Sequence, residues 1–427
     1  MMLTTILAVV IGILLIGISV SLLIIAVSTL YVTTHAWWDP RTQASTSYEE
    51  LMPEMAHSFS LIMPCRHESE LVMRTTLDHL CSQDHPNVEV IISVGHDDPK
   101  TVAIARKLAA ERPEMVRVSV DEGAVKNKPR QLNTALALCR NDVVGVFDAE
   151  SIAAPSLLRH VDSCFQAKEA DVVQGAVQLI NYRDTWYSLR NCLEYFMWFR
   201  SRLHAYAKRG FIPLGGNTVF IRREVLSSVD GWDSDCLAED CDLGVRLSVR
   251  HRKIVIAYSP HLVTKEETPD SIPALIKQRT RWSLGFMQVF AKRDWATLPT
   301  LRQRAIAWWT LMQQHFMAFT GLCIPICIIT AIFGKFPLGV TMLTFIPLIP
   351  TVAALAFDMC MLREFGRDHG FKIRTYDYVR LVLATPFYQI LLAYSALRAL
   401  IKFRQSDFRW EKTRHAGSHL GYLGARA

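Results

Sequence analysis

The sequence predicts an α/β domain with a mainly parallel sheet, joined to a set of membrane-spanning helices. Short apolar runs of strand length alternate with helical patterns between residues 58 and 178, and such alternation favours a parallel sheet covered on both faces. Long apolar runs with few or no charges lie near both ends of the chain. With 427 residues and 50% hydrophobic content, the chain is longer and more apolar than one soluble domain.

The first apolar run covers residues 6 to 32 and exceeds the roughly 20 residues needed to cross a bilayer. No charged residue precedes Asp39, whereas a signal peptide has a basic start and a shorter apolar core. We therefore predict a transmembrane helix within residues 1–38. Residues 39–57 are polar and have no apolar period, which predicts a linker at the membrane interface.

The next part of the chain shows strand and helix patterns in regular alternation. Ligands bind such sheets at the carboxyl ends of the strands. The predicted strands are residues 58–64, 88–94, 116–120, 142–147 and 171–178, and the predicted helices are residues 71–80, 101–110 and 130–139.

Polar side chains follow these strands. Glu68 comes after the first, Asp97 and Asp98 after the second, and Asp148 and Glu150 after the strand that ends at residue 147. Any one of them alone is more often a turn or cap residue. Two carboxylates one residue apart beyond a strand can also face one hard cation, which suits Mg²⁺ or Mn²⁺.

Two further segments allow two interpretations each. Residues 186–206 form a helical stretch rich in aromatic and basic side chains, suited to the bilayer interface or to a buried core. Gly216 and Asn217, in the run Gly215-Gly216-Asn217, permit close approach of an acceptor sugar or form an ordinary turn.

Two segments together indicate a sugar-transfer chemistry: the carboxylates Glu239-Asp240 and the later run from Gln278 to Trp282. Gln278, Arg281 and Trp282 share one helix face because they are spaced i, i+3 and i+4. A transferase that joins a nucleotide-activated sugar to a hydroxyl needs a carboxylate base and a cation for the departing diphosphate. Asp240 is the candidate base, while the neighbouring Asp242 is open to an interpretation as a helix cap.

Ala238-Glu239-Asp240, followed about forty residues later by Q-x-x-R-W, resembles the motifs of membrane-embedded family 2 glycosyltransferases, the synthases of cellulose, chitin and hyaluronan type. The family more often has Thr at the position of Ala238. The resemblance implies a GT-A fold, Asp240 with Glu239 as the catalytic pair, and Asp148-Ala149-Glu150 as the counterpart of the metal-binding D-x-D motif. The second carboxylate departs from that motif, being Glu rather than Asp.

The resemblance also implies the binding residues. Glu68 and one of Asp97 or Asp98 would hold the uracil and ribose of the donor, and the segment Lys126-Asn127-Lys128 would offer a cation near the phosphates. The implied donor set is Glu68, Asp97, Asp98, Lys126, Asp148, Gln278, Arg281 and Trp282; the acceptor set is Gly216, Asn217 and Trp282; and the metal ligands are Asp148 and Glu150.

The C-terminal third is predicted to return to the membrane. Residues 316–333 and 338–357 are each long enough to cross, and the basic loop that follows is cytosolic by the positive-inside rule. Residues 381–397 are marginal in length and contain Pro386, which predicts a re-entrant or broken hairpin that leaves the basic tail cytosolic. In that tail, Trp410, Lys412 and Arg414 loosely resemble the W-G-T-R segment that closes over the donor site in hyaluronan synthases.

The predicted organisation is therefore an anchor (1–38), a linker (39–57), a cytosolic catalytic domain (58–300), membrane helices (301–401) and a basic tail (402–427), in a multi-pass protein of the cell membrane. The net charge of +7 lies beside apolar stretches, which favours anionic membrane lipids and a diphosphate donor over nucleic acid.

The predicted reaction is inverting, metal-dependent extension of a polysaccharide from a nucleotide sugar, with a UDP-sugar as the expected donor and passage of the glycan through the membrane helices. The alternative is a single transfer to a lipid acceptor. A transporter or scaffold would explain the apolar helices but not the ordered set Asp148, Asp240 and Arg281.

Overall fold

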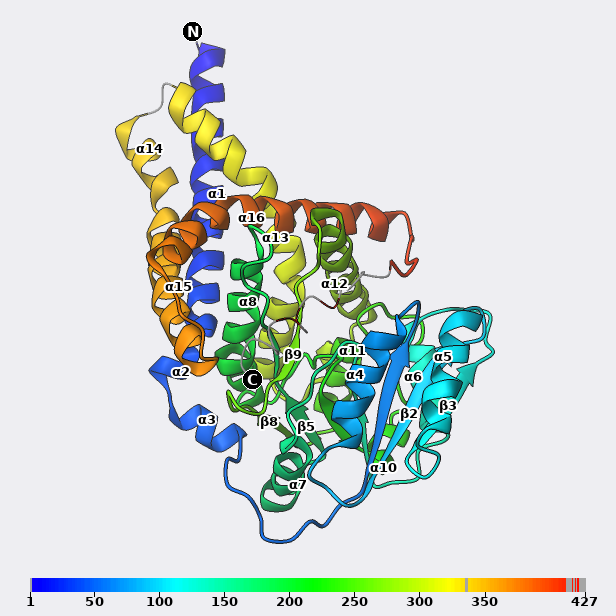
Figure 1. The fold of residues 1–427 in the computed structure, drawn as a ribbon. Coiled ribbons are helices and arrows are strands. Elements are labelled where there is room, and N and C mark those ends of the chain that lie inside the picture. Colours follow the sequence, from blue (N-terminus) through cyan, green and yellow to red (C-terminus); the bar gives the residue numbers. More distant parts are fainter. Residues whose placement is uncertain (1, 335–336, 412–416, 418, 420, 422–427) are drawn as a thin grey trace.

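A seven-stranded sheet forms the centre of the α/β half of the protein in Figure 1. The computed structural model describes residues 2–334, 337–411, 417, 419 and 421. The strand order is β3-β2-β1-β4-β7-β5-β8, and all neighbours are parallel except β7, which is antiparallel to β4 and β5. The strands are β1 (Phe59–Cys65), β2 (Val88–Gly95), β3 (Val116–Asp121), β4 (Val143–Val146), β5 (Val172–Gly175), β7 (Val219–Arg222) and β8 (Ile254–Ala257).

Helices cover both faces of this sheet, as the continuous apolar runs of its strands require. Phe59, Leu61 and Met63 of β1 pack into the cluster on one face, and Ile62 packs into the cluster on the other. The first face carries α4 (Glu70–Cys81), α5 (Pro99–Ala110) and α7 (Leu157–Lys168), and the second carries α6 (Lys128–Leu136), α9 (Leu203–Ala207), α10 (Arg223–Ser227) and α11 (Glu239–Val249). The predicted α/β architecture is confirmed.

The strand predicted at residues 171–178 is two strands. β5 stays in the main sheet, whereas β6 (Val177–Leu179) pairs in parallel with β9 (Thr264–Glu266) in a separate two-stranded sheet. The apolar pattern continues through the junction while the partner strand changes, so periodicity alone did not reveal the break. This switch places the end of β9 beside the residues that follow β4.

The aromatic segment at residues 186–206 is a core element. α8 (Ser188–Met197) continues through a π-helical turn (Trp198–Arg202) into α9, and Leu189, Leu193 and Phe196 are fully buried. These residues agree with the buried interpretation, while Trp186, just before α8, is exposed. The linker contains the short helices α2 (His35–Trp38) and α3 (Arg41–Thr46), and Gln43 donates a hydrogen bond of 2.7 Å to the carbonyl of Arg200.

Long apolar helices form the other half of the protein. In the described residues, four segments are long and apolar enough to cross a membrane: Val9–Thr33, Leu301–Thr330, Leu338–Asp368 and Thr375–Arg404. They belong to α1 (Met2–Thr33), α13 (Leu301–Phe333), the pair α14 (Leu338–Phe345) and α15 (Leu348–Asp368), and α16 (Thr375–Arg404). Figure 1 shows α1, α13 and α14–α15 running along one general direction, with α16 lying across them.

The hairpin predicted within residues 381–397 is wrong, because α16 is one continuous helix that contains Pro386. Proline removes one helical hydrogen bond, but Leu381, Ala384 and Tyr388 are buried against the rest of the protein and hold this part helical. α16 packs on α8, α13 and α12 (Ile272–Lys292), and a short 3-10 turn (Asp294–Thr297) leads from α12 to α13.

Candidate functional site

The candidate base lies in the first turn of α11. Asp240 Oδ1 accepts a hydrogen bond of 2.8 Å from the backbone N–H of Cys241. A Cβ atom on Gly216 would lie 3.1 Å from Asp240 Oδ2, so glycine allows the segment before β7 to approach this carboxylate closely. Asp242 has a separate role, because its carboxylate pairs with Arg246 at 2.8 Å and with Lys292 at 2.6 Å.

Glu239 and Asp240 hold their protons more tightly than ordinary carboxylic acids. Burial raises the pKa of Glu239 to about 7, and the neighbouring charge of Asp240 acts in the same direction. Burial also raises the pKa of Asp240, while the backbone N–H of Cys241 and the nearby charges of Lys128 and Arg281 oppose the shift. A raised pKa is suited to a group that must accept a proton near neutral pH.

Lys128 connects this turn to the end of β4. Its ammonium group forms an ion pair with Asp148 and donates a hydrogen bond of 2.9 Å to the carbonyl of Gly216. Burial alone would lower the pKa of Lys128, but the charges of Asp148, Glu239 and Asp240 outweigh burial and raise it. Lys128 therefore lies among the candidate catalytic carboxylates. Lys126, the residue chosen from sequence, instead contacts His96 at 2.8 Å.

The structure separates the two aspartates that follow β2. Asp98 caps α5: it accepts hydrogen bonds from the backbone N–H of Thr101 at 3.2 Å and of His67 at 2.6 Å, and it is 5% exposed. Asp97 pairs with Arg66 at 2.6 Å and stays partly open to solvent. Lys126 Nζ lies 3.9 Å from Asp97. Asp97 is thus the more accessible of the two aspartates, and the half-buried Glu68 lies on the neighbouring loop.

Asp148 and Glu150, which follow β4, lie near Glu266, the last residue of β9. Burial raises the pKa of Glu266 well above its ordinary value, and the charges of Glu150 and Asp148 add to this effect. Asn217 joins the two segments: its Oδ1 accepts from the backbone N–H of Asp148 at 3.3 Å, its Nδ2 donates to Ser151 at 2.8 Å, and it also contacts Glu266. Asn217 is 7% exposed, so its side chain holds this turn together, and its predicted contact with an acceptor stays a prediction.

These carboxylates fit a hard divalent cation. Their mutual repulsion would be relieved by such an ion, and carboxylate oxygens are its preferred ligands. In the described ranges no group of three or more His, Cys, Asp or Glu side chains surrounds a single point where a metal ion could bind. The residues that could hold such an ion are Asp148, which pairs with Lys128 in this structure, and Glu150.

The Q-x-x-R-W residues lie on α12, which packs against the start of α11. Gln288 Oε1 accepts a hydrogen bond of 2.9 Å from the backbone N–H of Leu237, two residues before Glu239. Arg281 is close enough to the acidic turn for its charge to act against the raised pKa values of both Glu239 and Asp240. Gln278 is buried. Trp282 lies beside the guanidinium of Arg279, whose Cζ is 4.7 Å from the indole centroid.

Residues 56–285 match the family model described as Glycosyltransferase like family 2. The chain belongs to glycosyltransferase family 2. It is 26% identical to the β-monoglucosyldiacylglycerol synthase of Trichormus variabilis, over 87% of this chain and 79% of that protein. It is 23% identical to the poly-β-1,6-N-acetyl-D-glucosamine synthase of Staphylococcus epidermidis, over 64% of this chain and 65% of that protein.

The GT-A fold is confirmed by a solved structure. The mannosyltransferase PcManGT from Pyrobaculum calidifontis, determined with GDP-Man and Mn²⁺, matches with a TM-score of 0.65 and 17% identity. The match covers 92% of this chain and 99% of that structure, so the likeness includes the helices outside the sheet domain.

The C-terminal tail of this glycosyltransferase reaches the same site. The Cζ atom of Arg281 lies 5.8 Å from the centroid of the Trp410 ring. Farther along, His419 Nε2 lies 2.9 Å from the carbonyl oxygen of Glu150, and its Nδ1 lies 3.3 Å from Glu267 Oε2. Lys412 and Arg414, the other predicted gating residues, lie outside the described residues.

Several site residues of the glycosyltransferase were missed from sequence. Glu266 and Glu267 are adjacent acidic residues shortly before Pro269, a pattern that could have marked them as candidates. No sequence pattern marks His419. Arg279 lies inside the recognised motif. It pairs with Glu194 at 2.7 Å and donates to the Tyr388 hydroxyl at 2.9 Å, so it fixes α12 to α8 and α16.

Proposed function

We propose that this glycosyltransferase transfers one hexosyl group, with inversion, from a nucleotide sugar to the hydroxyl of a membrane lipid. The observation that carries the proposal is the convergence of Asp240, the Lys128–Asp148 pair and Arg281 in one place. A base, a cation and a carboxylate suited to a metal are the parts that hydroxyl-to-sugar transfer needs.

In this mechanism the Asp240 carboxylate accepts the proton of the acceptor hydroxyl as its oxygen bonds to the anomeric carbon. The bond from that carbon to the diphosphate breaks at the same time, and one displacement inverts the configuration. Arg281 and Lys128 face the negative charge that develops on the diphosphate. A divalent cation held by Asp148 and Glu150 would supply charge neutralisation for the donor phosphates. Trp410, next to Arg281, would close over the donor and exclude water.

We further propose that α1, α13 and α14–α15 cross the membrane while α16 lies in its plane. One face of α16 is buried through Leu381 and Tyr388, and the opposite face exposes Leu383, Phe387 and Ile390. A helix with one packed face and one exposed apolar face is suited to the bilayer interface. This arrangement keeps the tail beside the catalytic domain and agrees with the crosswise course of α16 in Figure 1.

Two observations favour a lipid over a growing glycan as the acceptor. The similarity to the β-monoglucosyldiacylglycerol synthase extends over 87% of this chain, whereas the similarity to the poly-N-acetylglucosamine synthase covers 64%. The proposed topology also leaves few crossing helices with which to enclose a translocated polymer. Polysaccharide synthesis remains the second candidate, supported by that second relative and by the motif resemblance.

The test uses the purified full-length protein in lipid nanodiscs with dioleoylglycerol, and UDP-glucose, UDP-N-acetylglucosamine or GDP-mannose as donor. Nucleoside diphosphate release and mass spectra of the lipid extract report turnover and product. We expect a monohexosyl lipid, and a loss of about 10²–10⁴-fold in turnover for Asp240→Asn.

The matched control for Asp240→Asn is Asp235→Asn, the same change at an exposed aspartate five residues earlier, and it should retain wild-type turnover. A polymeric product would overturn the lipid assignment. Wild-type turnover in Asp240→Asn would remove Asp240 from the role of base.

A further inference from the structure

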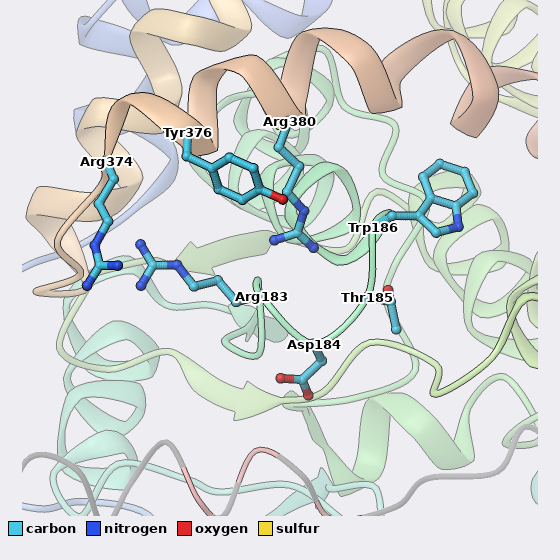
Figure 2. Close-up of a pocket in the computed structure, with 7 residues that line it drawn as sticks. All are labelled: Arg183, Asp184, Thr185, Trp186, Arg374, Tyr376 and Arg380. Carbon is cyan, nitrogen blue, oxygen red and sulfur yellow. The ribbon is translucent and has the colours of Figure 1, made fainter.

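A pocket lies between the loop that precedes α8 and the first half of α16, and none of its residues belongs to the transfer site. It has a volume of about 510 Å³ and is lined by Arg183, Asp184, Thr185, Trp186, Arg374, Tyr376 and Arg380. Figure 2 shows Arg380 of α16, and Arg374 just before it, extending toward the loop that carries Arg183 and Trp186, with the Tyr376 ring beside Arg380.

The charges around this pocket are not balanced. Asp377 is fully buried and pairs with Arg183 at 2.8 Å, which ties the loop to the start of α16. Asp184, the carboxylate in the lining, accepts a hydrogen bond of 2.8 Å from Asn181. In the part of the chain that the structure describes, neither Arg374 nor Arg380 forms an ion pair with a carboxylate. Two guanidinium groups thus face one cavity without a direct ion pair among the described residues, although Arg380 is near enough to the buried Asp377 for their charges to interact.

The remaining lining groups suit a phosphate. Guanidinium groups bind phosphate oxygens through paired N–H donors, and the hydroxyl of Tyr376 can also donate. The pocket opens at the N-terminal end of the 30-residue helix α16, where the helix dipole favours an anion. Because Arg183 is already paired with Asp377, Arg374 and Arg380 would carry most of the recognition.

The surroundings of the pocket favour a lipid over a soluble phosphate. Trp186 lies edge-on to Phe387 with 6.5 Å between ring centroids, and both side chains are exposed. Phe387 belongs to the exposed apolar face of α16. An arginine-lined cavity bordered by exposed aromatic side chains matches the boundary between lipid headgroups and acyl chains.

We propose that this pocket binds the phosphate of an anionic membrane lipid, with the acyl chains lying along the exposed face of α16. The proposal depends on the in-plane placement of α16 and is independent of which sugar or acceptor the transfer site uses. On this proposal, the positive charge at the start of α16 binds one lipid headgroup and does not merely attract the membrane surface in general.

The experiment measures binding of short-chain lipids to the purified full-length protein in a zwitterionic detergent, by thermal shift and titration. The probes are dioctanoyl phosphatidic acid, dioctanoyl phosphatidylcholine and inorganic phosphate. We expect saturable binding of the phosphatidic acid alone, weakened about fivefold in Arg380→Gln and in Arg374→Gln.

Arg363→Gln is the matched control, because Arg363 is exposed on α15, has no ion pair among the described residues and lies outside the pocket. It should bind the phosphatidic acid as the wild type does. The melting temperature without lipid shows whether each variant is folded. If one of the two pocket variants does not fold, the other still tests the proposal.

Three results would overturn the proposal. If inorganic phosphate bound as tightly as phosphatidic acid, and Arg380→Gln removed that binding, the pocket would be a site for free anions. Equal binding of phosphatidylcholine would assign recognition to apolar contacts alone. Equal weakening in Arg363→Gln would show that the charge acts diffusely.

Discussion

The contact between α12 and the start of α11 should control catalysis through Gly285. A Cβ atom at this position would lie 2.5 Å from both the Cβ and the backbone nitrogen of Ala238, and 2.9 Å from the carbonyl carbon of Leu237. These atoms directly precede Glu239 and Asp240. Gly285 also lies one turn after Arg281 on the same helix, so Gly285→Ala pushes the candidate base and the candidate phosphate-binding arginine apart.

The size of the effect follows from these distances. Carbon atoms pack at about 3.5 Å or more, so the substituted helix must move by roughly 1 Å. A misplacement of this size costs about 10²-fold in rate. Overpacking costs about 1–3 kcal/mol in stability, and the better helix propensity of alanine returns about 1 kcal/mol. The protein should therefore stay folded while its turnover falls about a hundredfold.

The assay compares sugar transfer and melting temperature in Gly285→Ala and in Gly339→Ala. Gly339 lies in α14, where a Cβ atom would have no neighbour within 4 Å, so its substitution should leave both properties near wild type. If Gly285→Ala kept turnover within about twofold of wild type, this contact would not position the base.

Three further predictions concern the site itself. Asp148→Ala should abolish donor binding that depends on Mg²⁺ or Mn²⁺, measured by calorimetric titration; activity that survives both this change and EDTA would contradict the metal assignment. Arg281→Lys should lower kcat/KM by about tenfold or more, because an ammonium group cannot make the two-pronged contact of a guanidinium with phosphate; equal rates would contradict a two-pronged contact between Arg281 and the diphosphate. The acidic limb of kcat/KM should lie above the pH range in which an ordinary aspartic acid titrates, because burial raises the pKa of Asp240, so the base becomes protonated as the pH falls. In Glu239→Gln the limb should move to lower pH, since one negative charge beside Asp240 is gone; an unchanged midpoint would show that the two groups do not interact.

Local patterns in the sequence determined most of the fold. Strands β1 to β4 and helices α4 to α6 lie within a few residues of their predicted bounds, because buried parallel strands and amphipathic helices each leave a periodic apolar signal in their own residues. The motifs around Asp148, Asp240 and Arg281 also indicated the family and its chemistry, and their catalytic roles stay predictions. Uncharged apolar runs marked the long helices for the same local reason.

Tertiary structure decided the features that depend on partners far apart in the chain. Asp98 differs from Asp97 because it caps α5 and accepts a hydrogen bond from the backbone N–H of His67. Lys128, and not Lys126, forms the ion pair with Asp148. Glu266 joined the site because β6 left the main sheet to pair with β9. α16 stayed one helix through Pro386 because a whole face of it packs on other helices. Each outcome depends on the free energy of contacts between segments that are distant in sequence, and the local residue pattern does not indicate those contacts.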